Sequence, residues 1–130
     1  MVVDDDEEFT SLYEAYLNMA GFDAIAENRS SKAMAVAYSE RPDVFVVDLM
    51  MPEPDGFQLC RMLRADPNFR HTPIIIVTAL TDLDSKIVAL GAGANDYLTK
   101  PFHIENLKSR INTLLESSRA AKSITMNPVT

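Results

Sequence analysis

Five side chains capable of chemistry follow short apolar runs at four separate points of the chain. They are Asp4 and Asp5 after Val2-Val3, Asp48 after Val44 to Val47, Thr78 after Ile74 to Val77, and Lys100 after Tyr97 to Thr99. Carboxylates a few ångströms apart repel one another strongly unless a cation shares them, and oxygen ligands without His or Cys favour a hard ion, most naturally Mg²⁺. Mg²⁺ beside a carboxylate, a lysine and a hydroxyl is suited to phosphoryl transfer. In that chemistry Asp48 is the nucleophile, and Lys100 and Thr78 bind phosphoryl oxygens.

The apolar pattern alternates between strand and helix five times, which predicts the elements that bring these side chains together. We expect strands at 1–3, 22–26, 44–47, 73–77 and 95–99, and helices at 6–20, 30–40, 57–65, 82–91 and 103–118. This is the pattern of a three-layer α/β domain with a parallel sheet, since each connection is long enough for a crossover. All carboxyl ends of a parallel sheet lie at one edge, so the five side chains are expected to converge there. The first strand is unusually short.

Size and charge narrow the possible classes of protein. The chain of 130 residues is long enough for one domain, which we place at residues 1–118, and residues 119–130 lack periodicity and are expected to form a linker or disordered tail. The net charge of −7 argues against direct binding of nucleic acid and against an anionic membrane as partner. The single cysteine, Cys60, excludes an internal disulfide, and no apolar run is long enough to span a membrane. We therefore expect a cytoplasmic protein.

Four short motifs resemble the signatures of one known family. Val3-Asp4-Asp5-Asp6 is similar to an acidic pair, and Asp48 with Met51-Pro52 and Asp55-Gly56 is similar to a phosphorylation loop. Val77-Thr78-Ala79 and Leu98-Thr99-Lys100-Pro101-Phe102 complete the set. In this order the motifs resemble the receiver domain of two-component response regulators. The resemblance implies a flavodoxin-like (CheY-like) three-layer α/β/α sandwich with a five-stranded parallel sheet of order 2-1-3-4-5 and five helices.

The same resemblance implies a role for each site residue. Asp48 would accept a phosphoryl group from a sensor histidine kinase or a phosphotransfer protein. Asp5, Asp48 and the backbone carbonyl of Met50 would bind Mg²⁺, and Asp4 would act on the ion through a water molecule. Lys100 would bind the phosphoryl group together with the hydroxyl of Thr78.

The resemblance also implies a switch. Thr78 and Tyr97 match a pair in which the hydroxyl is drawn to the phosphoryl group and the ring follows inward. This movement would change the face formed by 82–91, 95–99 and 103–118, which would act on an output domain or a downstream protein, with a homodimer through that face as a further expectation. Lys100-Pro101 matches a peptide bond that is usually cis in the family.

Other interpretations stay open at this point. Taken alone, Asp48 is also typical of the start of a turn, and Lys100 is also suited to be only its counter-ion. A flavin or nucleotide binder of the same fold is disfavoured because the acids at 4–8 would repel phosphate. A haloacid-type phosphatase is disfavoured because Met50 stands where that family has a second Asp. The serious alternative is a receiver-like interaction module that works without phosphorylation.

Overall fold

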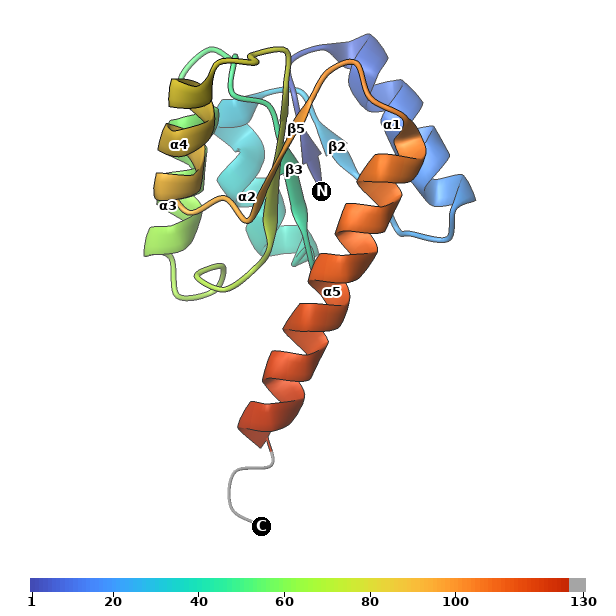
Figure 1. Ribbon diagram of the computed structural model, residues 1–130, viewed down its shortest axis with the longest axis vertical. Coiled ribbons are helices and arrows are strands. Elements are labelled where there is room, and N and C mark those ends of the chain that lie inside the picture. Colours follow the sequence, from blue (N-terminus) through green and yellow to red (C-terminus); the bar gives the residue numbers. More distant parts are fainter. Residues whose placement is uncertain (127–130) are drawn as a thin grey trace.

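The computed structural model describes residues 1–126 as a parallel five-stranded sheet between two layers of helices (Figure 1). The strands are β1 (Val2–Val3), β2 (Ala26–Glu27), β3 (Phe45–Val47), β4 (Ile74–Thr78) and β5 (Asp96–Thr99). The helices are α1 (Glu7–Met19), α2 (Ala33–Glu40), α3 (Gly56–Ala65), α4 (Leu83–Gly91) and α5 (Ile104–Met126), with a 3₁₀ turn, η1 (Ser30–Lys32), before α2. The strand order is β2-β1-β3-β4-β5, which confirms the predicted topology.

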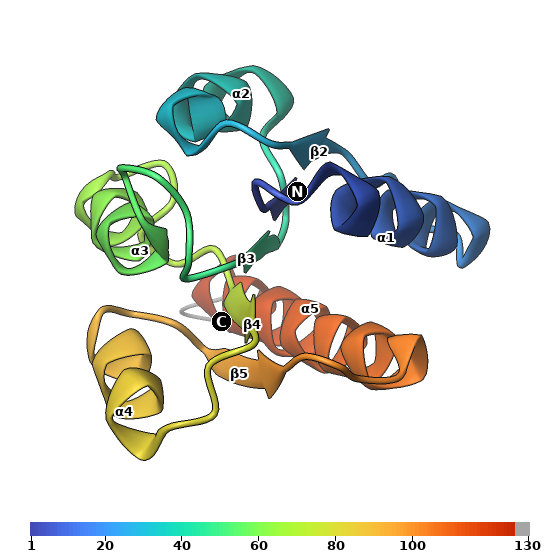
Figure 2. The ribbon, with the colours of Figure 1, turned by 90° about the horizontal axis from the view of Figure 1, so that it is seen from above.

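Alternating side chains of the strands build one apolar core on each face of the sheet. Seen from above, α1 and α5 cover one face and α2, α3 and α4 cover the other (Figure 2). The core under α1 and α5 contains Val2, Val46, Ile75, Val77 and Leu98 from the strands, with Leu17, Leu107 and Ile111 from the helices. The opposite core contains Val3, Phe45, Val47, Ile74 and Ile76, with Ala37, Leu59, Leu63 and Ala89 from the helices. Both faces of the central strands are buried, as their uninterrupted apolar runs require.

The strand register brings the polar ends of the strands to one edge. Val3 of β1 is paired with Val47 of β3, so Asp4 and Asp48, the residues that follow, leave the sheet side by side. On the other side of β3, Val47 is paired with Ile76 of β4. The expected convergence of strand ends is therefore a property of the register.

The second strand is shorter and lies later than the predicted 22–26. The register pairs Val2 with Ala26 and Val3 with Glu27, so the very short β1 has partners only at these two positions. Before these two positions, the side chain of Asn18 forms two hydrogen bonds with the backbone of Ala24. It accepts from the Ala24 N–H at 2.8 Å and donates to the Ala24 carbonyl at 3.4 Å. These bonds take the place of ladder hydrogen bonds.

The last helix is longer than predicted, since α5 continues to Met126 instead of ending near Ser118. Ala and Lys residues at 120–122 are strong helix formers, and neither Gly nor Pro interrupts the helix before Pro128. The helix therefore runs through most of the segment that we expected to be a linker or tail. Residues 127–130 of that segment lie outside the described residues.

Candidate functional site

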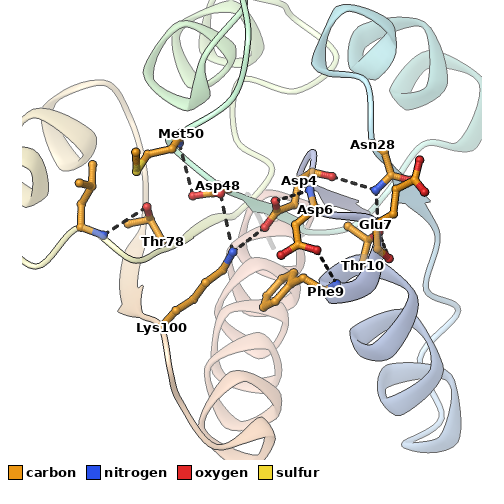
Figure 3. Close-up of polar contacts among 11 residues, drawn as sticks. Asp4, Asp6, Glu7, Phe9, Thr10, Asn28, Asp48, Met50, Thr78 and Lys100 are labelled. Atoms are coloured by element: carbon orange, nitrogen blue, oxygen red, sulfur yellow. Dashed lines mark hydrogen bonds and ion pairs between the residues drawn. The ribbon is translucent and has the colours of Figure 1, made fainter.

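Three carboxylates meet at the carboxyl ends of β1 and β3. Figure 3 shows two of them, Asp4 and Asp48, on either side of the Lys100 ammonium. Asp4, Asp5 and Asp48 each offer one oxygen, and these atoms lie within 4.8 Å of one another. Asp4 is 1% exposed and Asp48 is 8% exposed, whereas Asp5 faces solvent. Burial raises the pKa of Asp4, while its hydrogen bond to Lys100 opposes that rise.

Lys100 places one ammonium between two of these carboxylates. Its Nζ lies 2.7 Å from Oδ2 of Asp4 and 3.7 Å from Oδ2 of Asp48. Three carboxylates and one ammonium leave a local charge of two negative units when all are ionised. Because all the donors are oxygens, this cluster fits a hard divalent cation such as Mg²⁺.

Hydrogen bonds from the start of α1 and from the end of β2 hold Asp4 in place. Its Oδ1 accepts from the backbone N–H of Asp6 at 3.0 Å, and its carbonyl accepts from Nδ2 of Asn28 at 2.9 Å. Asn28 also donates to Oγ1 of the buried Thr10 at 2.7 Å. Sequence reasoning missed Asn28 because the second strand was predicted to end too early. With the strand at Ala26–Glu27, Asn28 follows a strand end as the other site residues do.

The loop after Asp48 needs a glycine to close. A Cβ on Gly56 would lie 2.2 Å from the backbone carbonyl oxygen of Asp48, so only glycine fits at this position. The preceding residue, Asp55, caps α3 by accepting from the N–H of Gln58, and the Gln58 side chain accepts in return from the N–H of Asp55. This capping box starts α3 directly under the loop and fixes the backbone that carries Asp48.

Met50 lies at the mouth of the site. Its backbone N–H points to Oδ1 of Asp48 at 3.4 Å, and its side chain is exposed. The Lys100–Pro101 peptide bond is cis, as the resemblance implies, and Glu53–Pro54 in the same loop as Met50 is also cis, which we did not predict.

Thr78 and Tyr97 both contact a third residue, Leu80. The Oγ1 of the fully buried Thr78 accepts from the N–H of Leu80 at 3.5 Å, and the Tyr97 hydroxyl donates to the Leu80 carbonyl at 2.8 Å. Tyr97 is 9% exposed, so its ring is turned inward, and burial raises the pKa of its hydroxyl. The predicted switch pair is thus connected through the backbone of one residue in the β4–α4 loop.

The fold and the site together define a class of protein. A parallel sheet of order 2-1-3-4-5 between helices, with an acidic site at its carboxyl edge, is a flavodoxin-like α/β domain of the CheY type. Residues 1–112 match the family model of the response regulator receiver domain. The chain belongs to this family, and it is a signalling domain rather than a classical enzyme.

Similar proteins agree with this assignment. The DNA-binding dual master transcriptional regulator RpaA of Synechocystis sp. is 38% identical over 115 residues, which cover 88% of this chain and 48% of that protein. Response regulator PleD of Caulobacter vibrioides is 39% identical over 114 residues, which cover 88% of this chain and 25% of that protein. The solved structure of the BeF3-activated N-terminal receiver domain of Klebsiella pneumoniae RstA has a TM-score of 0.82 and 35% identity, covering 88% of this chain and 95% of that one.

Two further facts bear on the function. The chain spans about half the length, or less, of these curated relatives. Within residues 1–126, no helix combines the length and the apolar character needed to cross a bilayer.

Proposed function

We propose that Asp48 accepts a phosphoryl group, in a Mg²⁺-dependent reaction, from a phosphohistidine of a sensor histidine kinase or a phosphotransfer protein. The observation that carries this proposal is the position of the Lys100 ammonium, shared between Asp4 and Asp48 at the end of the central strand. A carboxylate that is 8% exposed remains open to an incoming donor, while its surroundings supply positive charge. The cytoplasm, where such donors occur, is the compartment we propose for this reaction.

In the proposed reaction one P–O bond forms and one P–N bond breaks. An oxygen of Asp48 attacks the phosphorus, and the electron pair of the P–N bond returns to the imidazole, which takes up a proton. Lys100 binds one oxygen of the transferred group, and Thr78 donates its hydroxyl to another. Asp48 then carries an acyl phosphate.

The acidic residues would hold the metal ion in two ways, directly and through water. Asp5, Asp48 and the backbone carbonyl of Met50 would bind Mg²⁺ directly, and Asp4 would act through a water molecule. When bound, Mg²⁺ neutralises the charge of phosphoryl oxygens. The net negative charge of the three carboxylates, which one ammonium only partly balances, supports this assignment.

Leu80 would connect the phosphorylation site to the surface that acts on partners. A Thr78 hydroxyl that turns to the phosphoryl group alters its contact with the Leu80 N–H, and Tyr97 holds the same residue by its carbonyl. The change would reach the face formed by α4, β5 and α5, where Leu83 and Ile87 of α4 are exposed. We propose that this face acts on an output domain or a downstream protein, or pairs with a second copy.

Two charged residues of this face pair with each other. Arg110 of α5 pairs within the same chain with Asp96 of β5, at 2.5 Å, so this pair would have to open before either residue could bind a partner. Because the curated relatives are longer than this chain, we propose that an output domain accompanies the receiver in the whole protein, with the end of the chain as linker.

The domain would also assist the loss of its own phosphoryl group. Met50 lies beside Asp48 and offers no carboxamide to orient a hydrolytic water. We expect Met50→Asn to change the rate of dephosphorylation, measured by the decay of the purified phosphorylated domain. An unchanged rate would contradict this role of position 50.

The test of the proposed function is phosphorylation of the purified chain by acetyl phosphate with and without Mg²⁺, followed by intact mass. We expect one phosphoryl adduct that requires Mg²⁺ and is absent in Asp48→Asn, with NMR shifts that spread from Thr78 to Tyr97. Asp23→Asn, a carboxylate at the opposite edge of the sheet, is the matched control and should retain the adduct. A chain that takes up no phosphoryl group while its partners still bind it would instead be an interaction module that works without phosphorylation.

A further inference from the structure

An aromatic ring lies against the ammonium of Lys100. The Nζ of Lys100 is 3.8 Å from the ring centroid of Phe9, a position suited to a cation–π contact (Figure 3). The motifs that identify the family do not include Phe9, which sits in the first turn of α1, one turn after the acidic pair. The role of this ring is therefore a separate question.

The structure holds Phe9 firmly from two sides. Asp6, the N-cap of α1, accepts from the backbone N–H of Phe9 at 3.1 Å. The Phe9 ring stacks on Tyr13, one turn along the same helix, with centroids 4.2 Å apart. It also meets Phe102 edge-on at 6.4 Å, and Phe102 lies two residues after Lys100. The cluster of Phe9, Tyr13 and Phe102 thus joins the start of α1 to the segment that carries Lys100.

The Lys100 side chain is flexible, so its ammonium needs a further contact to stay in position. Its four-carbon stem carries substantial rotamer entropy, and the ammonium lies closer to Asp4 than to Asp48. If Asp48 receives a phosphoryl group, the ammonium has to shift from one carboxylate toward the new oxygens. A ring face attracts the cation without fixing the direction of its N–H donors, so the contact persists while the hydrogen bonds change.

We propose that Phe9 is a positioning residue for Lys100: its ring face holds the ammonium within reach of both Asp4 and Asp48 and guides it to the phosphoryl group. This inference rests on the proposed function, since it assigns a use to the contact in phosphorylation. A purely structural ring would only fill space beside the lysine stem, and any apolar side chain of similar volume would then suffice.

The test varies the charge distribution of the ring at nearly constant shape. Phenylalanines carrying one, two or three fluorine atoms are incorporated at position 9, and the initial rate of Mg²⁺-dependent phosphorylation by acetyl phosphate is measured for each. Fluorine weakens the negative face of the ring, so we expect a stepwise fall that reaches about three- to tenfold. The same amino acids at Phe102, in the same aromatic cluster, are the matched control and should leave the rate unchanged.

Two further measurements accompany this series. Phe9→Leu should lower the initial rate of phosphorylation as much as the most fluorinated ring does. Phe9→Tyr keeps an aromatic face and should keep the rate of the unmodified chain. The ε-methylene protons of Lys100 should show an upfield ring-current shift in the NMR spectrum of the unmodified chain, and Phe9→Leu should abolish it. Midpoints of urea unfolding verify that each fluorinated chain folds.

The outcomes separate this inference from the proposed function. A rate that does not depend on fluorine at position 9, or that falls equally with fluorine at Phe102, overturns the role of Phe9 and leaves phosphorylation of Asp48 standing. An unmodified chain that takes up no phosphoryl group overturns the proposed function, and the positioning role falls with it. In that case the failure appears in the unmodified chain rather than in its variants.

Discussion

The removal of one acidic side chain should make the domain more stable without Mg²⁺ and less stable with it. In Asp48→Asn the carboxylate at the centre of the cluster becomes a neutral amide of nearly the same shape. Asp48 is repelled by Asp4 and Asp5 and attracted by Lys100, so the sign of the effect depends on which contribution is larger.

Coulomb energies at an effective dielectric of about 20 give the balance. Two charges 4.8 Å apart, the upper limit for the three carboxylate oxygens, repel by about 3.5 kcal/mol. We take the full value for the buried Asp4 and about half for Asp5, which solvent screens. The attraction of Lys100 at 3.7 Å is about 4.5 kcal/mol. Repulsion therefore exceeds attraction by about 1 kcal/mol, and relief of the desolvation of Asp48 adds to this difference.

The assay is unfolding by urea in the presence of a chelator and then at increasing Mg²⁺. Without Mg²⁺ we expect Asp48→Asn to raise the free energy of unfolding by about 1 to 2 kcal/mol. At a Mg²⁺ concentration of about one hundred times the dissociation constant, the unchanged domain gains about 2.7 kcal/mol. The variant has lost one ligand and gains less, so the order of stability should reverse.

Asp23→Asn is the control, and its stability should respond to Mg²⁺ as that of the unchanged domain does. A lower stability of Asp48→Asn without Mg²⁺ would refute the reasoning, because the Lys100 attraction would then outweigh the repulsion. Parallel Mg²⁺ responses of Asp48→Asn and the unchanged domain would refute the role of Asp48 as a ligand.

Three more predictions concern positions outside the charge cluster. Gly56→Ala should lower the free energy of unfolding by about 3 kcal/mol, because the added Cβ would overlap the backbone of the loop. Gly91→Ala is the control: its Cβ would meet open space, so the change should be neutral or stabilising by up to about 1 kcal/mol. Urea unfolding measures both effects. Arg64→Met should lower the free energy of unfolding by about 2 to 3 kcal/mol in the same assay, because the guanidinium donates to three backbone carbonyls and one amide side chain. The same change at the exposed Arg61 should leave the free energy of unfolding almost unchanged. Cys60 is fully buried and desolvation raises its pKa to about 11, so it stays a thiol at pH 8; a thiol reagent should modify it only as fast as the domain unfolds, and rapid reaction of the folded chain would contradict this.

Much of the site was predictable because it depends on strand ends. Asp4, Asp48 and Lys100 each follow an apolar run, and a parallel sheet brings such positions together whatever the details of packing. The capped start of α1 after the acidic run was predictable for a similar reason, because Asp6 acts through its own backbone neighbours. Local chemistry and topology suffice for these features.

The features that were missed depend on contacts between side chains distant in sequence. The position of β2 follows from its pairing with the two-residue β1. It also follows from the Asn18 side chain of α1, which forms a hydrogen bond with the backbone of Ala24 just before the strand. The contact of Phe9 with Lys100 joins residues 91 positions apart, and no periodicity marks it. Leu80 contacts Thr78 and Tyr97 through its backbone, so its residue type gives no signal.

The position of Leu80 explains how a change of charge in this site would become a change of shape. Under the proposed function, phosphorylation adds about one negative unit to Asp48, and the local donors that respond are the ammonium of Lys100 and the hydroxyl of Thr78. The ammonium already touches the carboxylates, and its shift from Asp4 toward the phosphoryl group stays inside the site. The hydroxyl instead contacts the N–H of Leu80, whose carbonyl holds the inward ring of Tyr97. The movement of Thr78 thus passes through Leu80 to Tyr97 of β5, so the surface of α4, β5 and α5 would follow the hydroxyl.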